Sequence, residues 1–172
     1  GNFSSIGYCK LLSPLVVDHR DESPLLIAET EDEKHGIEDP RIVKIDDTYY
    51  LTYTAYDGVN ALGALATSTD LIHWERKGLI VPKIHFKDFI LNSDINEKSY
   101  PKYTRFNDPN RHYENLSEDL YMWIKNIFFF PRRIKNKLCF LIRIKPDIQI
   151  VNSIDSIEDL TPEFWESYFK SF

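Results

Sequence analysis

The sequence predicts an all-β fold built from repeated sheet units. Aromatic residues make up 14% of the 172-residue chain, and aromatic side chains favour the pleated surface of a sheet. Short runs rich in β-branched and aromatic residues recur along the chain, and one pattern of such runs occurs twice. A chain of this length fits one domain with a real core, so residues 1–172 are interpreted as a single domain. A β-sandwich whose runs resemble each other by coincidence is the alternative.

The repeat has two parts. Residues 44–53 and 133–142 each predict a strand, a tight turn marked by Asp or Asn, and a second strand. Residues 64–71 and 149–155 each predict a strand that ends in Ser-x-Asp, and residues 6–10 form a weaker third copy. Several short strands per unit, with aromatic residues in each unit, are typical of a propeller blade.

Two segments depart from this pattern. Residues 83–126 are polar and aromatic with interspersed prolines, which predicts a long insertion loop. Within this loop, residues 116–125 are expected to form a short helix with Ser117 as its N-cap. A terminal helix is expected over residues 161–171, because Thr161 is a good N-cap and is followed by proline and glutamate.

Charge and composition exclude several functions. The net charge is −6, which argues against nucleic acid as a partner. The sequence has no apolar run of the roughly 18 residues that a membrane span needs. No spacing of Cys or His residues suits a metal, so no metal site is expected. The chain begins at Gly1, so we expect a trimmed or partial chain; a cytoplasmic location is expected, with secretion left open.

Several longer motifs carry a resemblance to a known family. Residues 36–42 read Gly-Ile-Glu-Asp-Pro-Arg-Ile, and an aromatic strand follows at 49–55. The match continues through residues 66–78, and then through 129–134 and 141–143. This pattern resembles the signature of glycoside hydrolase family 130, whose members are inverting phosphorylases of β-mannosides.

The resemblance implies a fold and an assembly. Family members are single five-bladed β-propellers of roughly twice this length. The chain is therefore expected to form a partial five-bladed β-propeller, with about two blades and the fringe of a third. Because a partial propeller exposes unpaired strand edges, we expect self-association through these edges or a place within a larger protein.

The resemblance also implies a general acid. Inverting transfer to phosphate needs one carboxylic acid and a cationic phosphate site, with inorganic phosphate as co-substrate and no cofactor. By resemblance Asp39 is the acid and acts through a sugar hydroxyl; the alternative is that Asp39 only caps a turn. Glu38 is expected on the opposite face of the strand. Arg41 is expected on the face of Asp39, where it either binds substrate or keeps Asp39 ionised.

The phosphate site is expected to contain arginine, because its planar guanidinium donates two hydrogen bonds at once. Arg76 and Arg143 are the matched candidates, and Lys125 is a further one. A surface salt bridge is the alternative role for each of them.

Tyr53, Tyr56 and Asp57 are candidate residues for binding the oligosaccharide substrate, although Asp57-Gly58 is equally a turn signal. Where family members often carry His-Arg, this chain has Ile142 before its arginine. The predicted function is phosphorolysis of β-mannosides. The alternatives are a β-mannoside hydrolase of the same fold and a truncated, non-catalytic sugar-binding remnant.

Overall fold

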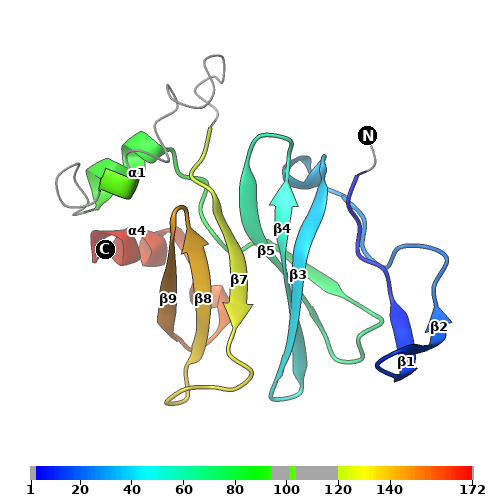
Figure 1. Ribbon diagram of the computed structural model, residues 1–172. Coiled ribbons are helices and arrows are strands. Elements are labelled where there is room, and N and C mark those ends of the chain that lie inside the picture. Colours follow the sequence, from blue (N-terminus) through cyan, green and yellow to red (C-terminus); the bar gives the residue numbers. More distant parts are fainter. Residues whose placement is uncertain (1–2, 94–100, 104–119, 172) are drawn as a thin grey trace.

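The computed structural model describes residues 3–93, 101–103 and 120–171, and its main sheet has seven strands in two antiparallel halves that stand side by side (Figure 1). We call these halves the first sheet and the second sheet. The first sheet contains β3 (Gly36–Ile45), β4 (Thr48–Tyr56), β5 (Ala61–Ser68) and β6 (Glu75–Leu79). The second contains β7 (Ile124–Phe129), β8 (Leu138–Ile144) and β9 (Asp147–Ile154). The remaining elements are β1 (Cys9–Ser13), β2 (Val16–Arg20), α1 (Phe86–Asn92), α4 (Pro162–Lys170) and two 3-10 turns, Glu31–Glu33 and Ile157–Asp159.

Each sheet begins with the hairpin that the repeat predicts. In the first sheet, β3 turns into β4 at Asp46, whose φ of 54° is the left-handed conformation that Asp tolerates in tight turns. In the second, Lys135 and Asn136 take φ values of 50° and 64° between β7 and β8. Both turns therefore lie at the residues for which the sequence predicts them.

The two sheets are adjacent blades of one β-structure. They are joined by a parallel bridge between Leu62 of β5 and Ile124 of β7. The first blade has four strands, because β6 pairs with β5. Among the described residues, no fourth strand pairs with β9; instead the hydroxyl of Tyr168 on α4 donates to the carbonyl of Ile150.

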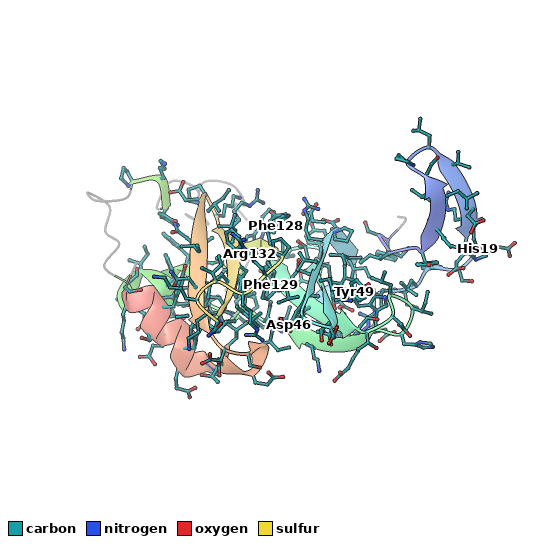
Figure 2. The ribbon with its side chains drawn as sticks, turned by 90° about the horizontal axis from the view of Figure 1, so that it is seen from below. His19, Asp46, Tyr49, Phe128, Phe129 and Arg132 are labelled. Atoms are coloured by element: carbon teal, nitrogen blue, oxygen red, sulfur yellow. The ribbon has the colours of Figure 1, made fainter. Side chains whose placement is uncertain are left out.

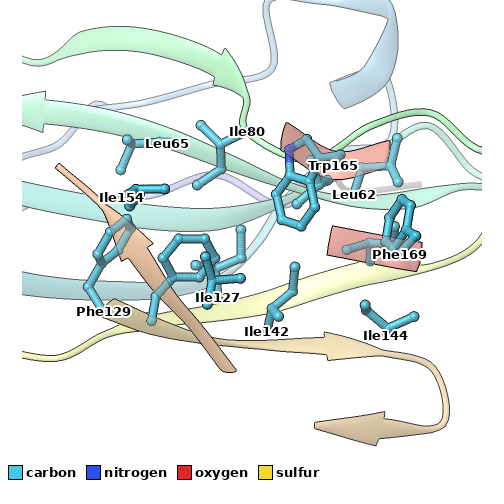
Figure 3. Close-up of a cluster of buried hydrophobic side chains, with 14 of the residues drawn as sticks. Leu62, Leu65, Ile80, Ile127, Phe129, Ile142, Ile144, Ile154, Trp165 and Phe169 are labelled. Carbon is cyan, nitrogen blue, oxygen red and sulfur yellow. The ribbon is translucent and has the colours of Figure 1, made fainter. Parts of the chain in front are cut away.

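The larger hydrophobic cluster lies between the blades and is closed by the helices, and a second, smaller cluster lies against the first blade. Leu62 and Leu65 from the first blade meet Ile127 and Ile142 from the second, together with Trp165 of α4 (Figure 3). Because strand side chains alternate between faces, the residues that neighbour these core positions point away from the core. The opposite face of the second blade is therefore free to carry polar groups.

The N-terminal hairpin of β1 and β2 projects from the first blade (Figure 2). All of its residues are exposed. It corresponds in position to the expected fringe of a third unit.

The insertion differs from the expectation at both ends. Residues 86–92 form helix α1, and residues 124–126 already belong to strand β7. The short helix expected over 116–125 is wrong for residues 120–125, because Tyr121 forms a β-bridge with His85 and β7 follows. Ser117 and the rest of that expected helix lie outside the described residues.

The C-terminal helix α4 begins as the sequence predicts. The side chain of Thr161 accepts a hydrogen bond from the backbone N–H of Phe164, and Pro162 occupies the first helical position. Trp165 and Phe169 lie four residues apart on one face of the helix and are buried in the core.

Candidate active site

Asp39 sits in a β-bulge of strand β3. Glu38 pairs with Thr54 and Arg41 pairs with Thr52, so Asp39 and Pro40 together face a single residue of β4. The φ of Asp39 is 52°, in the left-handed region that few residues other than Gly, Asn and Asp adopt. The bulge breaks simple strand alternation, and it presents the Asp39 carboxylate at the junction with the second blade.

A matching bulge lies in the first strand of the second blade. The register of β7 against β8 shifts between Lys125 and Phe128, and Asn126 has a φ of 54°. The Asn126 amide donates from Nδ2 to Oδ2 of Asp39 over 2.9 Å. Strands β3 and β7 therefore contact each other through Asp39 and Asn126, the left-handed residues of their bulges.

Lys125 brings a positive charge to the same oxygen. Its Nζ lies 3.7 Å from Oδ2 of Asp39, and its side chain is only 13% exposed. On the neighbouring strand, Arg143 is the register partner of Lys125. Within the described part of the chain, the buried Nε of Arg143 has no hydrogen-bond partner. An anion bound beside it would supply the missing acceptor.

Lys145 adds a third cation. Its Nζ lies 4.5 Å from the centre of the Trp123 ring, and the Nζ of Lys125 lies 5.5 Å from the same centre. Burial lowers the pKa of Lys145, and the charges of Arg143 and Lys125 lower it further. We call Lys125, Arg143 and Lys145 the cation cluster.

The turn between β4 and β5 contacts Trp123, the residue whose ring lies beside Lys125 and Lys145. The Asp57 carboxylate accepts from the backbone N–H groups of Val59 and Asn60, at 2.7 and 2.6 Å. Burial of Asp57 opposes ionisation, but these hydrogen bonds outweigh it and lower the pKa of the carboxyl group. The Trp123 indole N–H donates to the Val59 carbonyl. Asp57 thus shapes the turn on which Trp123 rests.

Tyr56 belongs to the same turn, because its hydroxyl donates to the carbonyl of Gly58 over 2.9 Å. Arg41 is exposed, and its guanidinium donates to the carbonyl of Pro40. None of the interactions that the structure gives Arg41 reaches the Asp39 carboxylate. The roles of Tyr56, Asp57 and Arg41 in substrate binding stay predictions.

Arg76 and Tyr53 form a different centre, inside the first blade. The Arg76 guanidinium binds both carboxylate oxygens of Glu33, at 3.1 and 3.0 Å, and the carbonyl of Ile27. The Tyr53 hydroxyl donates to Glu33 over 2.8 Å, and Glu33 is only 3% exposed. Burial and the bond to Glu33 raise the pKa of Tyr53 well above its usual range. Both groups are therefore committed to one buried carboxylate.

The position that departs from the family pattern is part of the core. Ile142 is fully buried and packs between the blades (Figure 3). Its neighbour Arg143 points to the opposite face of β8. Of the predicted site residues, the structure brings Asp39 and Lys125 into contact, and Arg143 lies beside Lys125.

Sequence reasoning missed Trp123, Asn126 and Lys145. The spacing Trp123-x-Lys125 in a strand would put both side chains on one face, and Arg143-x-Lys145 has the same spacing. These two pairs were available as signals. The bulge at Asn126 had only a weak signal, because Asn tolerates a left-handed backbone without requiring one.

A groove of about 640 Å³ lies between β9 and α4, lined by Gln149, Asn152, Phe164 and Tyr168 among others. It contains none of the predicted site residues. Among the described residues, no group of three His, Cys, Asp or Glu side chains is arranged to hold a metal ion. No described helix is long and apolar enough to cross a membrane.

The fold and the site define the chain as a partial β-propeller that carries the carboxylate of Asp39 beside a cation cluster. Residues 2–167 match the family profile described as beta-1,4-mannooligosaccharide phosphorylase. Because this match covers most of the sequence, the chain belongs to glycoside hydrolase family 130.

Three relatives illustrate this membership. The 1,2-beta-oligomannan phosphorylase of Thermoanaerobacter sp. (strain X514) is 38% identical over 109 residues, which are 60% of this chain and 35% of that protein. The structure of beta-1,2-mannobiose phosphorylase from Listeria innocua matches with a TM-score of 0.51 at 23% identity, over 81% of this chain and 30% of that one. A glycosyl hydrolase from Bacteroides ovatus matches with a TM-score of 0.57 at 17% identity, over 88% and 37%.

The structural matches show the fold, and they confirm a partial five-bladed propeller. The chain spans about a third of the length of the curated relatives that it matches.

Proposed function

We propose that this chain provides the acid and part of the phosphate site of an inverting β-mannoside phosphorylase. The observation that carries the proposal is the contact of Asp39 with Lys125, whose register partner is Arg143. A carboxyl group and converging cations are what phosphorolysis by inversion requires, since phosphate replaces both the attacking water and its general base.

In the proposed reaction, an oxygen of hydrogen phosphate attacks C1 of the mannosyl unit while the bond from C1 to the glycosidic oxygen breaks. Asp39 supplies a proton, through a sugar hydroxyl, to the departing oxygen. The proton lost by hydrogen phosphate restores Asp39. The products are α-mannose 1-phosphate and an oligosaccharide shortened by one unit.

The cation cluster is the proposed phosphate site. Arg143 offers a guanidinium whose buried Nε has no partner in the part of the chain that the structure describes, and Lys125 and Lys145 add two ammonium groups. Arginine and lysine bind phosphate through charge-assisted hydrogen bonds. Arg76 is left out of this proposal because Glu29 and Glu33 already neutralise it.

We propose β-1,2-linked mannosides as the substrates to test first. The relative from Thermoanaerobacter is named for that linkage and is 38% identical over the matched region. The family profile is named for the β-1,4 linkage, so both linkages belong in the assay.

Hydrolysis of the same substrates is the second candidate. Ile142 stands where family members often carry a histidine, and its side chain is buried in the core. A water molecule in place of phosphate would need fewer cations at the site. A chain that binds sugar without turnover is the third candidate, since Ile142 also leaves the site without the histidine that family members often carry.

The test is release of mannose 1-phosphate or mannose from β-1,2- and β-1,4-mannobiose, with and without inorganic phosphate. Asp39→Asn is the matched variant, because Asn also tolerates the φ of 52°. We expect phosphate-dependent release that falls at least about a hundredfold in Asp39→Asn. Release of mannose without phosphate would favour the hydrolase, and no turnover from a folded sample would contradict both enzymes.

A further inference from the structure

We infer that Asn126 is a positioning residue that decides which oxygen of Asp39 carries the catalytic proton. The inference rests on the proposed role of Asp39 as the acid. It adds a residue that the sequence did not single out and assigns it a task distinct from binding phosphate or sugar.

Two donors converge on one carboxylate oxygen. Oδ2 of Asp39 accepts from the Asn126 amide over 2.9 Å and lies 3.7 Å from the Lys125 ammonium. Within the described residues, Oδ1 of Asp39 has no hydrogen-bond partner. An oxygen that faces a cation and accepts an N–H retains the negative charge, so the proton of the acid form resides on the other oxygen.

The Asp39 side chain is 40% exposed, and solvent or substrate can approach it. Because Oδ2 is held against the second blade, Oδ1 is the oxygen available to a sugar hydroxyl. The Asn126 contact thus fixes the direction in which Asp39 presents its proton. This direction matters because the proton must reach one hydroxyl of a bound sugar.

The backbone supports this arrangement from both blades. Asp39 and Asn126 have nearly the same left-handed φ, at 52° and 54°, and each lies in a bulge of the first strand of its blade. The buried hydroxyl of Thr52 donates to the carbonyl of Ile127 over 2.7 Å and ties the second bulge to the first blade. Such conformations persist where the surroundings fix them, and they cluster at functional sites.

The contact uses a side-chain N–H donor on a left-handed residue, and Asn126 supplies both. An aspartate would place a second carboxylate against Oδ2, and like charges in contact disfavour ionisation. Alanine would remove the amide and also strain the left-handed backbone. Glycine removes the amide and keeps the backbone, so Asn126→Gly isolates the contribution of the side chain.

The experiment compares Asn126→Gly with Asn136→Gly. Asn136 is an exposed residue with a φ of 64° in the turn between β7 and β8, which makes it a matched control for the same substitution. We expect Asn126→Gly to lower kcat by roughly tenfold to a hundredfold with KM changed by less than about threefold, because the lost contact acts on the chemical step. Asn136→Gly should leave both constants unchanged.

A double-mutant cycle separates positioning from a general structural effect. In an Asp39→Asn background, Asn126→Gly should cause no further loss, because the proton it directs is gone. An equal loss in both backgrounds, or wild-type kinetics in Asn126→Gly, would overturn the inference.

A second readout does not depend on turnover. The side-chain amide resonances of Asn126 should shift in Asp39→Gly and stay in place in Asp46→Gly, since Asp46 is a left-handed aspartate whose carboxylate binds Arg133 instead. An insensitive amide would overturn the inference by itself. A sensitive amide in an inactive chain would keep the positioning contact and reject only the proposed function.

Discussion

Two arginines that look alike in the sequence differ in what neutralises them. Arg76 of the first blade binds Glu33 through both carboxylate oxygens and also lies 3.2 Å from Glu29. Arg143 of the second blade lies beside two lysines, and its buried Nε has no partner among the described residues. The first arginine is neutralised within its own blade, and the second is the one that we propose for the phosphate site.

The comparison shows that one residue type pairs with carboxylates in one blade and lies beside like charges in the next. A buried carboxylate such as Glu33 must be paired, so its removal from Arg76 is costly. A cluster of like charges destabilises the folded chain, and it is tolerated where a ligand of opposite charge offsets the repulsion.

The largest expected effect is on stability, and it falls on the first blade. Arg76→Met should lower the free energy of unfolding by about 3 kcal/mol, because it leaves the buried Glu33 without its cation. Arg143→Met should change the free energy of unfolding by no more than about 0.5 kcal/mol, because the methionine stem keeps the packing. Urea denaturation of both variants measures the difference. Equal losses would mean that Arg143 has a structural partner of its own.

A smaller effect is expected at Tyr53. Tyr53→Phe removes the hydrogen bond to Glu33 and should cost about 1 kcal/mol of unfolding free energy. Since the hydroxyl points to Glu33, KM for the mannoside should stay unchanged. A rise in KM without loss of stability would return Tyr53 to the substrate site.

The smallest effect concerns the pH dependence of stability. The pKa of Lys145 is lowered in the folded chain by burial and by Arg143 and Lys125. The unfolded chain therefore binds more protons between that lowered pKa and the ordinary value of 10.5, and stability rises with pH through this window. Below the window the destabilisation is constant.

Lys145→Gln should remove this rise and should stabilise the chain slightly at neutral pH. Thermal unfolding of the wild type and of Lys145→Gln between neutral pH and pH 10 measures how the stability of each changes with pH. A wild-type stability that falls more steeply than that of the variant over the same window would contradict the assignment.

Much of the fold could be predicted from local sequence. The turns at Asp46 and Asn136 and the helix start at Thr161 are set by residues next to them in the chain. The helix expected over residues 116–125 failed where the structure describes it. There, Tyr121 pairs with His85, and a contact between distant segments overrides the local helix signal.

The site was only partly predictable for the same reason. Asp39 was predicted from a motif, and Lys125 was a further candidate for the phosphate site. The surroundings of Arg76, in contrast, depend on Glu33, which is 43 residues away. The bulges at Asp39 and Asn126 depend on how two blades meet. Contacts between distant residues cannot be inferred from the sequence of one strand. These contacts determine which cations lie near Asp39.

The most direct test of the proposed site is a calorimetric titration of the chain with inorganic phosphate at constant ionic strength. Arg143→Met is the test variant, and Arg132→Met is the control because Arg132 is exposed in the turn after β7 (Figure 2). We predict that the wild-type chain binds phosphate, that Arg143→Met binds it at least about tenfold more weakly, and that Arg132→Met binds it as the wild type does. Binding that Arg143→Met leaves unchanged, or no binding by the folded wild-type chain, would contradict a phosphate site at Lys125, Arg143 and Lys145.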